Sequence, residues 1–196
     1  MKKLFCYLMI LTLIGCGSVY IPSYDIPKEK ILNSNEGIIF GTISLNKNSR
    51  IKNKYSFLFA EDGSKEIYNK KNSVNIALFN FIGAKHIPDF NDGDNAIYFF
   101  TIKRKNGKYY FYGLNTTEVV GTRFGGVQNM NTLTKIIIPF EIENEKVTYL
   151  GEIKFTEKIN ELGERLIEQI PQVTFSNQKD RDVVKFNQQF PNLKID

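Results

Sequence analysis

From residue 37 to residue 155 the chain consists of short stretches rich in Ile, Val, Phe and Tyr, which Gly, Asn and Asp residues separate. β-Branched and aromatic residues fit the pleated surface of a sheet, and the separating residues favour turns. The sequence therefore predicts a mainly-β domain with strands over residues 37–45, 55–59, 74–79, 96–105, 108–114, 135–143 and 146–155.

Two pairs of these strands are joined by short turns, which predicts two hairpins. Asn106-Gly107 favours a type I′ turn, because that turn needs positive φ at both central positions. The second turn lies at Asn144-Glu145, between strands in which apolar and polar residues alternate, as expected when one face is buried. Pro139 cannot donate a ladder hydrogen bond, so we expect its strand at a sheet edge or at a bulge.

Two helices are expected near the C-terminus. Apolar residues recur at helical spacing over residues 159–170, although a glycine and a following proline interrupt this pattern. The segment 178–189 has clearer boundaries, because Ser176 or Asn177 can cap its start and Pro191 ends it. Several strands followed by a terminal helix predict an antiparallel β-sandwich or barrel with one C-terminal α-helix. Of the two, we expect a single antiparallel β-sandwich.

The N-terminus has the order of a secretory signal. Lys2 and Lys3 precede an apolar run over residues 4–14, and Gly15 and Cys16 follow. A basic start, a short apolar core and a small residue before the cleavage point are typical of such signals. The apolar run is far shorter than the roughly twenty residues that a transmembrane helix needs. We therefore expect an export signal over residues 1–15.

The segment Leu13-Ile14-Gly15-Cys16 resembles the lipobox of bacterial lipoprotein precursors. The resemblance implies that Cys16 carries a diacylglyceryl group and becomes the first mature residue, so the protein binds the membrane through acyl chains. Each buried methylene contributes about 0.8 kcal/mol, and several chains hold a protein on a bilayer. The alternatives are an ordinary signal peptide and an uncleaved anchor. By resemblance to the enteric sorting rule, Gly17 implies an outer-membrane location in a Gram-negative cell.

The mature chain divides into a tether and one domain. Residues 16–36 lack sustained periodicity and contain Pro22 and Pro27, so we interpret them as a lipidated N-terminus and tether. Fully extended, some twenty residues reach about 60 Å from the bilayer. Residues 37–196 are long enough for one sizeable hydrophobic core and do not require a second domain.

Charge and cysteine content exclude some classes of protein. The formal charge of +5 falls by two, to +3, when Lys2 and Lys3 leave with the signal. This mild excess argues against nucleic acid as a partner. Of the two cysteines, Cys6 also leaves and Cys16 is acylated, so we expect no internal disulfide and stability from packing alone.

Catalytic and metal-binding patterns do not emerge from the remaining residues. His86 is the single histidine, without a free cysteine or a nucleophile elbow, and we interpret it as a loop residue. Asp89, Asn91, Asp92 and Asp94 superficially resemble a calcium loop, but the positions of the glycine and the final ligand do not fit an EF-hand. We assign no cofactor and no metal ligand. A looser calcium turn, or a metal-dependent hydrolase that uses this loop, is the alternative.

Several further groups of residues have a structural interpretation beside a functional one. Four glutamates have two interpretations: they supply a carboxylate pair for glycoside chemistry, or they form the outward polar face of a sheet. They are Glu141, Glu143, Glu145 and Glu152. The aromatic residues Tyr109-Tyr110-Phe111-Tyr112 form a stacking platform, or strand alternation buries at least half of them in the core. The glycines of 121–126 are interpreted as a loop. Basic residues form a patch for anionic lipid or glycan, or a solvated rim: Lys47, Arg50, Lys52, Lys54, Lys70, Lys71, Lys103, Arg104 and Lys105.

Three segments resemble small envelope lipoproteins with a transthyretin-like sandwich. These segments begin at Gly37, Phe100 and Pro139, and the terminal helix followed by Phe190-Pro191 is also similar. The polar residues 103–105 depart from the pattern of that group, which has no assigned chemistry. The sequence favours a lipid-anchored, non-enzymatic envelope protein that binds another envelope protein or has a structural role. A host-facing surface antigen or adhesin is a further alternative.

Overall fold

The computed structural model describes residues 20–21, 34–47, 54–65, 72–78, 85–121, 127–157, 172–193 and 195. The predicted signal, Cys16 and the predicted helix over 159–170 lie outside these residues. The described elements are β1 (Tyr20–Ile21), β2 (Glu36–Asn46), β3 (Lys54–Glu61), β4 (Ser73–Ala77), β5 (Lys85–His86), β6 (Phe90–Asp92), β7 (Asn95–Lys105), β8 (Gly107–Gly121), β9 (Val127–Ile142), β10 (Val147–Thr156), β11 (Gln172–Ser176), α2 (Lys179–Gln189) and the 3-10 helix η2 (Pro191–Leu193).

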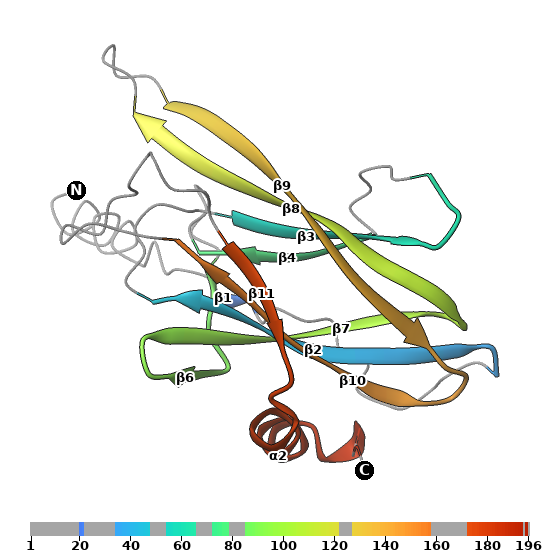
Figure 1. The fold of residues 1–196 in the computed structure, drawn as a ribbon. Coiled ribbons are helices and arrows are strands. Elements are labelled where there is room, and N and C mark those ends of the chain that lie inside the picture. The colour runs from blue at the N-terminus through green and yellow to red at the C-terminus, as the bar shows by residue number, and fades with distance from the viewer. Residues whose placement is uncertain are drawn as a thin grey trace, which may run out of the picture.

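The strands form two main sheets and one small pair. The five-stranded sheet has the order β11-β10-β2-β7-β6, the four-stranded sheet has the order β4-β3-β8-β9, and β1 pairs with β5. Figure 1 shows the two main sheets as stacked layers, with α2 on the far side of the five-stranded sheet. The predicted mainly-β class is confirmed. The expected purely antiparallel pairing is wrong, because β10 runs parallel to β2 and β1 runs parallel to β5.

The hydrophobic core lies between the facing surfaces of the two main sheets. Strand alternation directs aromatic and β-branched side chains inward from both layers. The rings of Phe100 and Phe111, which belong to different sheets, lie 6.0 Å apart, and those of Tyr55 and Phe155 lie 5.3 Å apart. All four side chains are buried. Edge-to-face geometry at both contacts adds to the free energy gained by burial.

The predicted hairpin at Asn106-Gly107 is wrong, because the two strands it joins belong to different sheets. β7 pairs with β2 along its whole length, whereas β8 pairs with β3 and β9. The N–H of Asn106 donates to the carbonyl of Asn35 at 2.9 Å, which attaches this corner to the start of β2. A favourable turn sequence therefore changes the chain direction here without pairing its flanking strands.

The predicted hairpin at Asn144-Glu145 is wrong for the same reason. β9 lies in the four-stranded sheet and β10 in the five-stranded sheet. Glu145 adopts φ 57°, and its N–H donates to the carbonyl of Glu36 at 2.7 Å. The turn is thus attached to β2, and β10 continues beside β2 in the parallel direction.

The long hairpin of the structure is instead formed by β8 and β9. These strands pair from Gly107↔Ile142 to Gly121↔Val127 and extend well beyond the predicted 108–114 and 135–143. The parts of β8 and β9 beyond the predicted bounds are rich in Thr and Asn. The strands were predicted from apolar residues, so their predicted bounds are too short. The loop 122–126 lies outside the described residues.

Two local predictions are confirmed. Pro139 lies in β9, which is an edge strand, and the register of β8 and β9 shifts nearby, between Phe111 and Gly113. The helix expected over 178–189 is α2. The Oδ1 of Asn177 accepts the N–H of Lys179 at 2.9 Å, and η2 begins at Pro191.

We expect Phe111→Ala to destabilise the fold strongly. Phe111 is fully buried, and its ring contacts Phe59, Phe100 and Phe140. Truncation of a buried Phe costs about 3–5 kcal/mol, and each kcal/mol lowers the melting temperature of a domain of this size by about 2–4 °C. Thermal unfolding followed by circular dichroism measures the change. Val184→Ala, at an exposed helix position, is the control, and equal melting temperatures of the two variants would contradict this account of the core.

Candidate functional site

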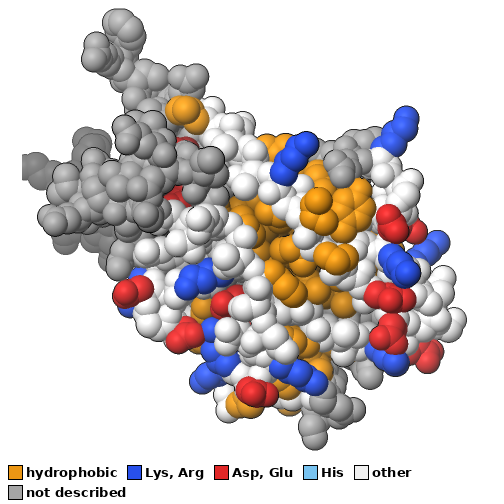
Figure 2. Space-filling model, viewed as in Figure 1, with side chains coloured by type: hydrophobic (Ala, Val, Ile, Leu, Met, Phe, Trp, Pro, Cys, Tyr) orange, Lys and Arg blue, Asp and Glu red, His pale blue; other side chains and the backbone are white. Residues whose placement is uncertain are grey.

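The outer face of the β8–β9 hairpin carries apolar side chains. In β9, Ile136, Ile138 and Phe140 point into the core, whereas Ile137 between them is 84% exposed. Leu133 is 58% exposed on the same strand. These exposures show that the face is open to solvent at both positions, whereas α2 packs on the other main sheet. Figure 2 shows hydrophobic side chains gathered where Figure 1 draws β8 and β9. Such exposed apolar patches are typical of interaction sites.

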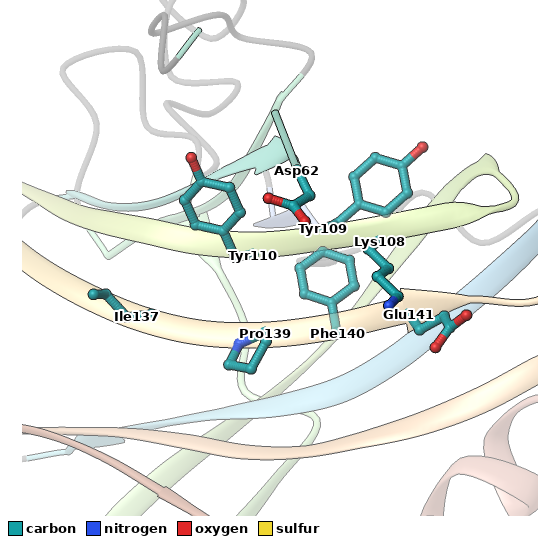
Figure 3. A pocket seen from close by; sticks show the side chains of 8 residues that line it. All are labelled: Asp62, Lys108, Tyr109, Tyr110, Ile137, Pro139, Phe140 and Glu141. Atoms are coloured by element: carbon teal, nitrogen blue, oxygen red, sulfur yellow. The ribbon is translucent and has the colours of Figure 1, made fainter. Parts of the chain in front are cut away.

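A pocket of about 590 Å³ opens on this face. β8 and β9 supply most of its walls, and Asp62 comes from the turn that follows β3 (Figure 3). The residues that line it are Asp62, Lys108, Tyr109, Tyr110, Ile137, Pro139, Phe140 and Glu141. An apolar hollow with a few charged groups has the composition of a binding site for a small ligand or a protruding side chain.

Tyr109 and Phe140 line the pocket, but their rings are buried in the core, where they stack. The rings of Tyr109 and Phe140 lie 5.6 Å apart and nearly parallel, at 14°, because these residues are cross-strand partners. The hydroxyl of Tyr109 donates to the carbonyl of Lys105 at 3.1 Å. Burial raises the pKa of Tyr109, and the negative charge of Glu61 adds to this effect. Tyr109 is therefore a neutral hydrogen-bond donor at physiological pH.

The half-buried Tyr110 forms the outer wall. Its ring lies 6.4 Å from that of Tyr112 in an edge-to-face arrangement, and Pro139 is its cross-strand partner. Lys108 and Glu141 are also cross-strand partners, so opposite charges lie at one end of the pocket. The pocket can therefore hold an apolar or aromatic group by contact and stacking, and it can meet polar atoms with Asp62, Lys108 and Glu141.

The opposite outer face of the molecule differs, because α2 covers it. Phe186 of α2 is fully buried, and its ring lies 4.1 Å from that of Phe40 and 5.6 Å from that of Phe99. Phe40 and Phe99 belong to the five-stranded sheet. The aromatic residues on the outside of this sheet thus form a second, smaller core with the helix.

A buried carboxylate fastens α2 to the sheet. Asp182 is fully buried, and its Oδ2 accepts hydrogen bonds from the hydroxyls of Thr42 and Tyr149, both at 2.7 Å. Burial of the phenol and its hydrogen bond to the carboxylate raise the pKa of Tyr149. The N–H of Gln178 donates to the Tyr149 oxygen at 3.1 Å. A buried charge needs such partners, since its desolvation costs several kcal/mol.

Arg181 neutralises part of this charge. Its guanidinium lies 2.8 Å from Asp182, 2.7 Å from Glu152 and 2.6 Å from Asp92, and it also lies over the ring of Phe90. Burial alone would lower the pKa of Arg181, but hydrogen bonds to the three carboxylates raise it above its usual value. The arginine therefore stays charged and joins α2 to β6 and β10.

The predicted calcium loop lies at this same junction. The carboxylate of Asp89 accepts the N–H of Phe99 at 2.7 Å and the side-chain amide of Gln189 at 2.9 Å. Asp92 pairs with Arg181, and Asp94 lies 3.6 Å from Lys47. Across the described ranges, no group of three or more His, Cys, Asp or Glu side chains is arranged to hold a metal ion. These carboxylates contact separate protein groups and do not converge.

His86 lies in β5 and not in a loop. Its Nδ1 accepts the N–H of Ala77 at 2.7 Å, which ties β5 to the end of β4. Burial lowers the pKa of His86, the Ala77 carbonyl oxygen, 3.3 Å from Nδ1, raises it, and the positive charge of Lys54 lowers it again, with a net decrease. His86 is therefore neutral near pH 7 and keeps its acceptor nitrogen.

The other predicted groups are dispersed. Glu141 lines the pocket, Glu143 pairs with Lys146, and Glu152 is buried against Arg181, so these glutamates do not form one site. The aromatic run alternates as predicted, with Tyr109 and Phe111 in the core.

The predicted basic patch is also divided. Lys47 pairs with Asp94, Lys103 pairs with Glu36 at 3.2 Å, and Arg104 lies over the ring of Phe59. Residues 50, 52, 70 and 71 lie outside the described ranges.

Sequence reasoning missed both the pocket and the buried carboxylate. Ile137 interrupts the alternation of polar and apolar residues in β9 and is exposed. This break in the alternation was the sequence signal that could have indicated the pocket. Asp182 had no comparable signal, because charged residues in the first turn of a helix are common on solvated helices. Only the position of α2 on the sheet shows that Asp182 is buried.

No family model matches the chain, and no curated protein matches its sequence. Among solved structures, the chain is similar to a leucine-rich repeat protein from Bacteroides thetaiotaomicron, with a TM-score of 0.35 and 9% identity over 62% of this chain. The match spans 14% of that protein's chain. A similarity of this size carries no argument about fold or function. In the described part of the chain, no helix has the length and hydropathy to cross a membrane.

We expect Asp182→Ala to loosen α2 and to lower stability. The change leaves the hydroxyls of Thr42 and Tyr149 without their acceptor and removes one partner of Arg181. Breaking a buried ion pair costs about 3–5 kcal/mol. Urea unfolding measures the loss, and hydrogen exchange shows whether α2 opens first. Asp180→Ala, in the same helical turn but exposed, is the matched control; equal midpoints for the two variants would show that the buried network does not fasten the helix.

Proposed function

We propose that this chain is a lipid-anchored bacterial envelope protein that acts as a non-enzymatic binding module through the outer face of its β8–β9 hairpin. One observation carries the proposal. The outer face of the five-stranded sheet is covered by α2, whereas the outer face of β8 and β9 keeps exposed apolar side chains around a pocket of about 590 Å³. A partner that covers this face would remove that apolar surface from water.

The chemistry of the pocket supports a protein partner with a protruding apolar or aromatic side chain. Tyr110 offers a stacking surface, Ile137 and Pro139 offer apolar contact, and charged residues lie at the margin. Interfaces in general combine a desolvated apolar and aromatic centre with a polar rim. The main chain of β8 and β9 holds these residues in register, so the surface is preformed.

The membrane anchor is proposed from the N-terminal sequence. The basic start, the short apolar run and the lipobox-like segment ending at Cys16 support acylation of that residue. In this proposal, residues 1–15 are removed and acyl chains hold the protein on the bilayer, in the outer membrane of a Gram-negative cell. The finer resemblance to transthyretin-like envelope lipoproteins is part of the same proposal.

We expect Cys16→Ser to abolish lipidation. The thiol is the acceptor of the diacylglyceryl group in the proposed reaction, and a serine hydroxyl does not replace it. In the native host, labelling with radioactive palmitate should mark the unchanged protein but not the variant, which should remain an unprocessed precursor. Cys6→Ser is the control and should be labelled normally. Equal labelling of the Cys16→Ser variant would refute the anchor.

We expect a partner to cross-link from the pocket face and not from the helix. A photoreactive phenylalanine analogue placed at Ile137 in intact cells should give one discrete adduct, whereas the analogue at Val184 should not. Both positions are exposed, at 84% and 54%, but Val184 lies on α2. Tyr110→Ala should reduce the adduct several-fold without changing the circular dichroism spectrum. No adduct at Ile137, or equal adducts at both positions, would count against the proposed face.

A further inference from the structure

The first described residues of the chain are attached to the domain. β1 (Tyr20–Ile21) pairs in parallel with β5 (Lys85–His86), with Tyr20 opposite Lys85 and Ile21 opposite His86. β1 lies within residues 16–36, the range that the sequence predicts as a tether, whereas β5 belongs to the predicted domain. Since β1 begins four residues after Cys16, the attachment point is close in sequence to the proposed lipid.

β5 is in turn connected to the four-stranded sheet. The backbone N–H of Ala77, at the end of β4, donates to Nδ1 of His86, and Lys54 of β3 lies close enough to affect the charge of the imidazole. β3 and β4 pair at this end, with Lys54 opposite Ala77. A continuous series of backbone and side-chain contacts therefore runs from β1 through β5 to the body of the domain.

We propose that the end of the domain formed by β1, β5 and Ile87 lies against the headgroups of the membrane that carries the lipid anchor. The inference rests on the proposed acylation of Cys16 and adds the orientation of the domain. Four extended residues span at most about 13 Å, in contrast to the roughly 60 Å that a free tether of twenty residues would allow. The pairing of β1 with β5 thus places this end of the domain next to the bilayer.

The side chains at this end suit an anionic lipid surface. Ile87 follows β5 directly and is 48% exposed, although it is a large apolar residue. Lys54 contributes positive charge, which anionic lipids attract. The nearby carboxylate of Asp89 accepts hydrogen bonds from the N–H of Phe99 and the side-chain amide of Gln189. This end thus offers an exposed apolar residue directly after β5 and a basic residue near His86 of β5, and apolar and basic residues together are the composition of membrane-contacting surfaces.

The absence of tryptophan from the sequence allows a direct test. The full-length lipidated protein carrying Ile87→Trp is reconstituted into vesicles of phosphatidylethanolamine and phosphatidylglycerol. We expect the indole emission to shift to shorter wavelength and to be quenched by lipids brominated on their acyl chains. Val184→Trp, at a similarly exposed position on α2, should keep the emission of an indole in water. Adding Ile21→Pro to Ile87→Trp should reverse the shift, because proline cannot complete the two-residue pair.

The outcomes separate this inference from the proposed anchor. Flotation of the protein with vesicles tests the anchor alone. Flotation without a shift at position 87, or with equal quenching at positions 87 and 184, would overturn the orientation while leaving the anchor intact. If Ile87→Trp perturbs the circular dichroism spectrum, amine acetylation of the unchanged protein gives a second reading. On vesicles, acetylation of Lys54 should fall several-fold more than acetylation of the exposed Lys185 of α2, each compared with the same lysine without vesicles. An equal decrease at the two lysines would refute the inference.

Discussion

Packing of aromatic rings between the two main sheets is the interaction on which the rest of the structure depends. Phe100 and Phe111 meet across the layers, and Phe59 and Phe140 surround Phe111. Because side chains alternate along a strand, directing one set of residues inward also determines which residues lie on the outer faces. The positions of Phe186, Ile137 and Tyr110 relative to solvent all follow from this arrangement.

The outer faces of the two main sheets differ in what covers them. On the five-stranded sheet, Phe40 and Phe99 are covered by α2, and the buried Asp182 with its hydroxyl partners holds the helix in place. On the four-stranded sheet, the hairpin of β8 and β9 keeps Ile137 in solvent. Removal of apolar surface from water is favourable on both faces. On the five-stranded sheet, α2 removes it, and on the four-stranded sheet we propose that a partner does so.

Turn sequences predicted where the chain reverses but not which strands pair. At Asn106-Gly107 and at Asn144-Glu145 the chain leaves one sheet and enters the other, and the turn backbones bond to Asn35 and Glu36 near the start of β2. Local conformational preference is the same for a hairpin and for such a corner. The choice depends on contacts with residues 71 positions away at the first corner and 109 positions away at the second, which a short sequence window does not contain.

The sequence by itself determined the mainly-β class, the position of α2 and the edge or bulge at Pro139, because strand composition, helix boundaries and the missing proline donor act locally. It also predicted that alternation buries at least half of residues 109–112, and the two buried residues are Tyr109 and Phe111. Only the tertiary structure decided that Asp182 is buried and that Tyr110, Ile137 and Asp62 share a pocket. These residues come from separate strands and turns, and their proximity arises from the pairing of β8 with β3 and β9 rather than from their spacing in the chain.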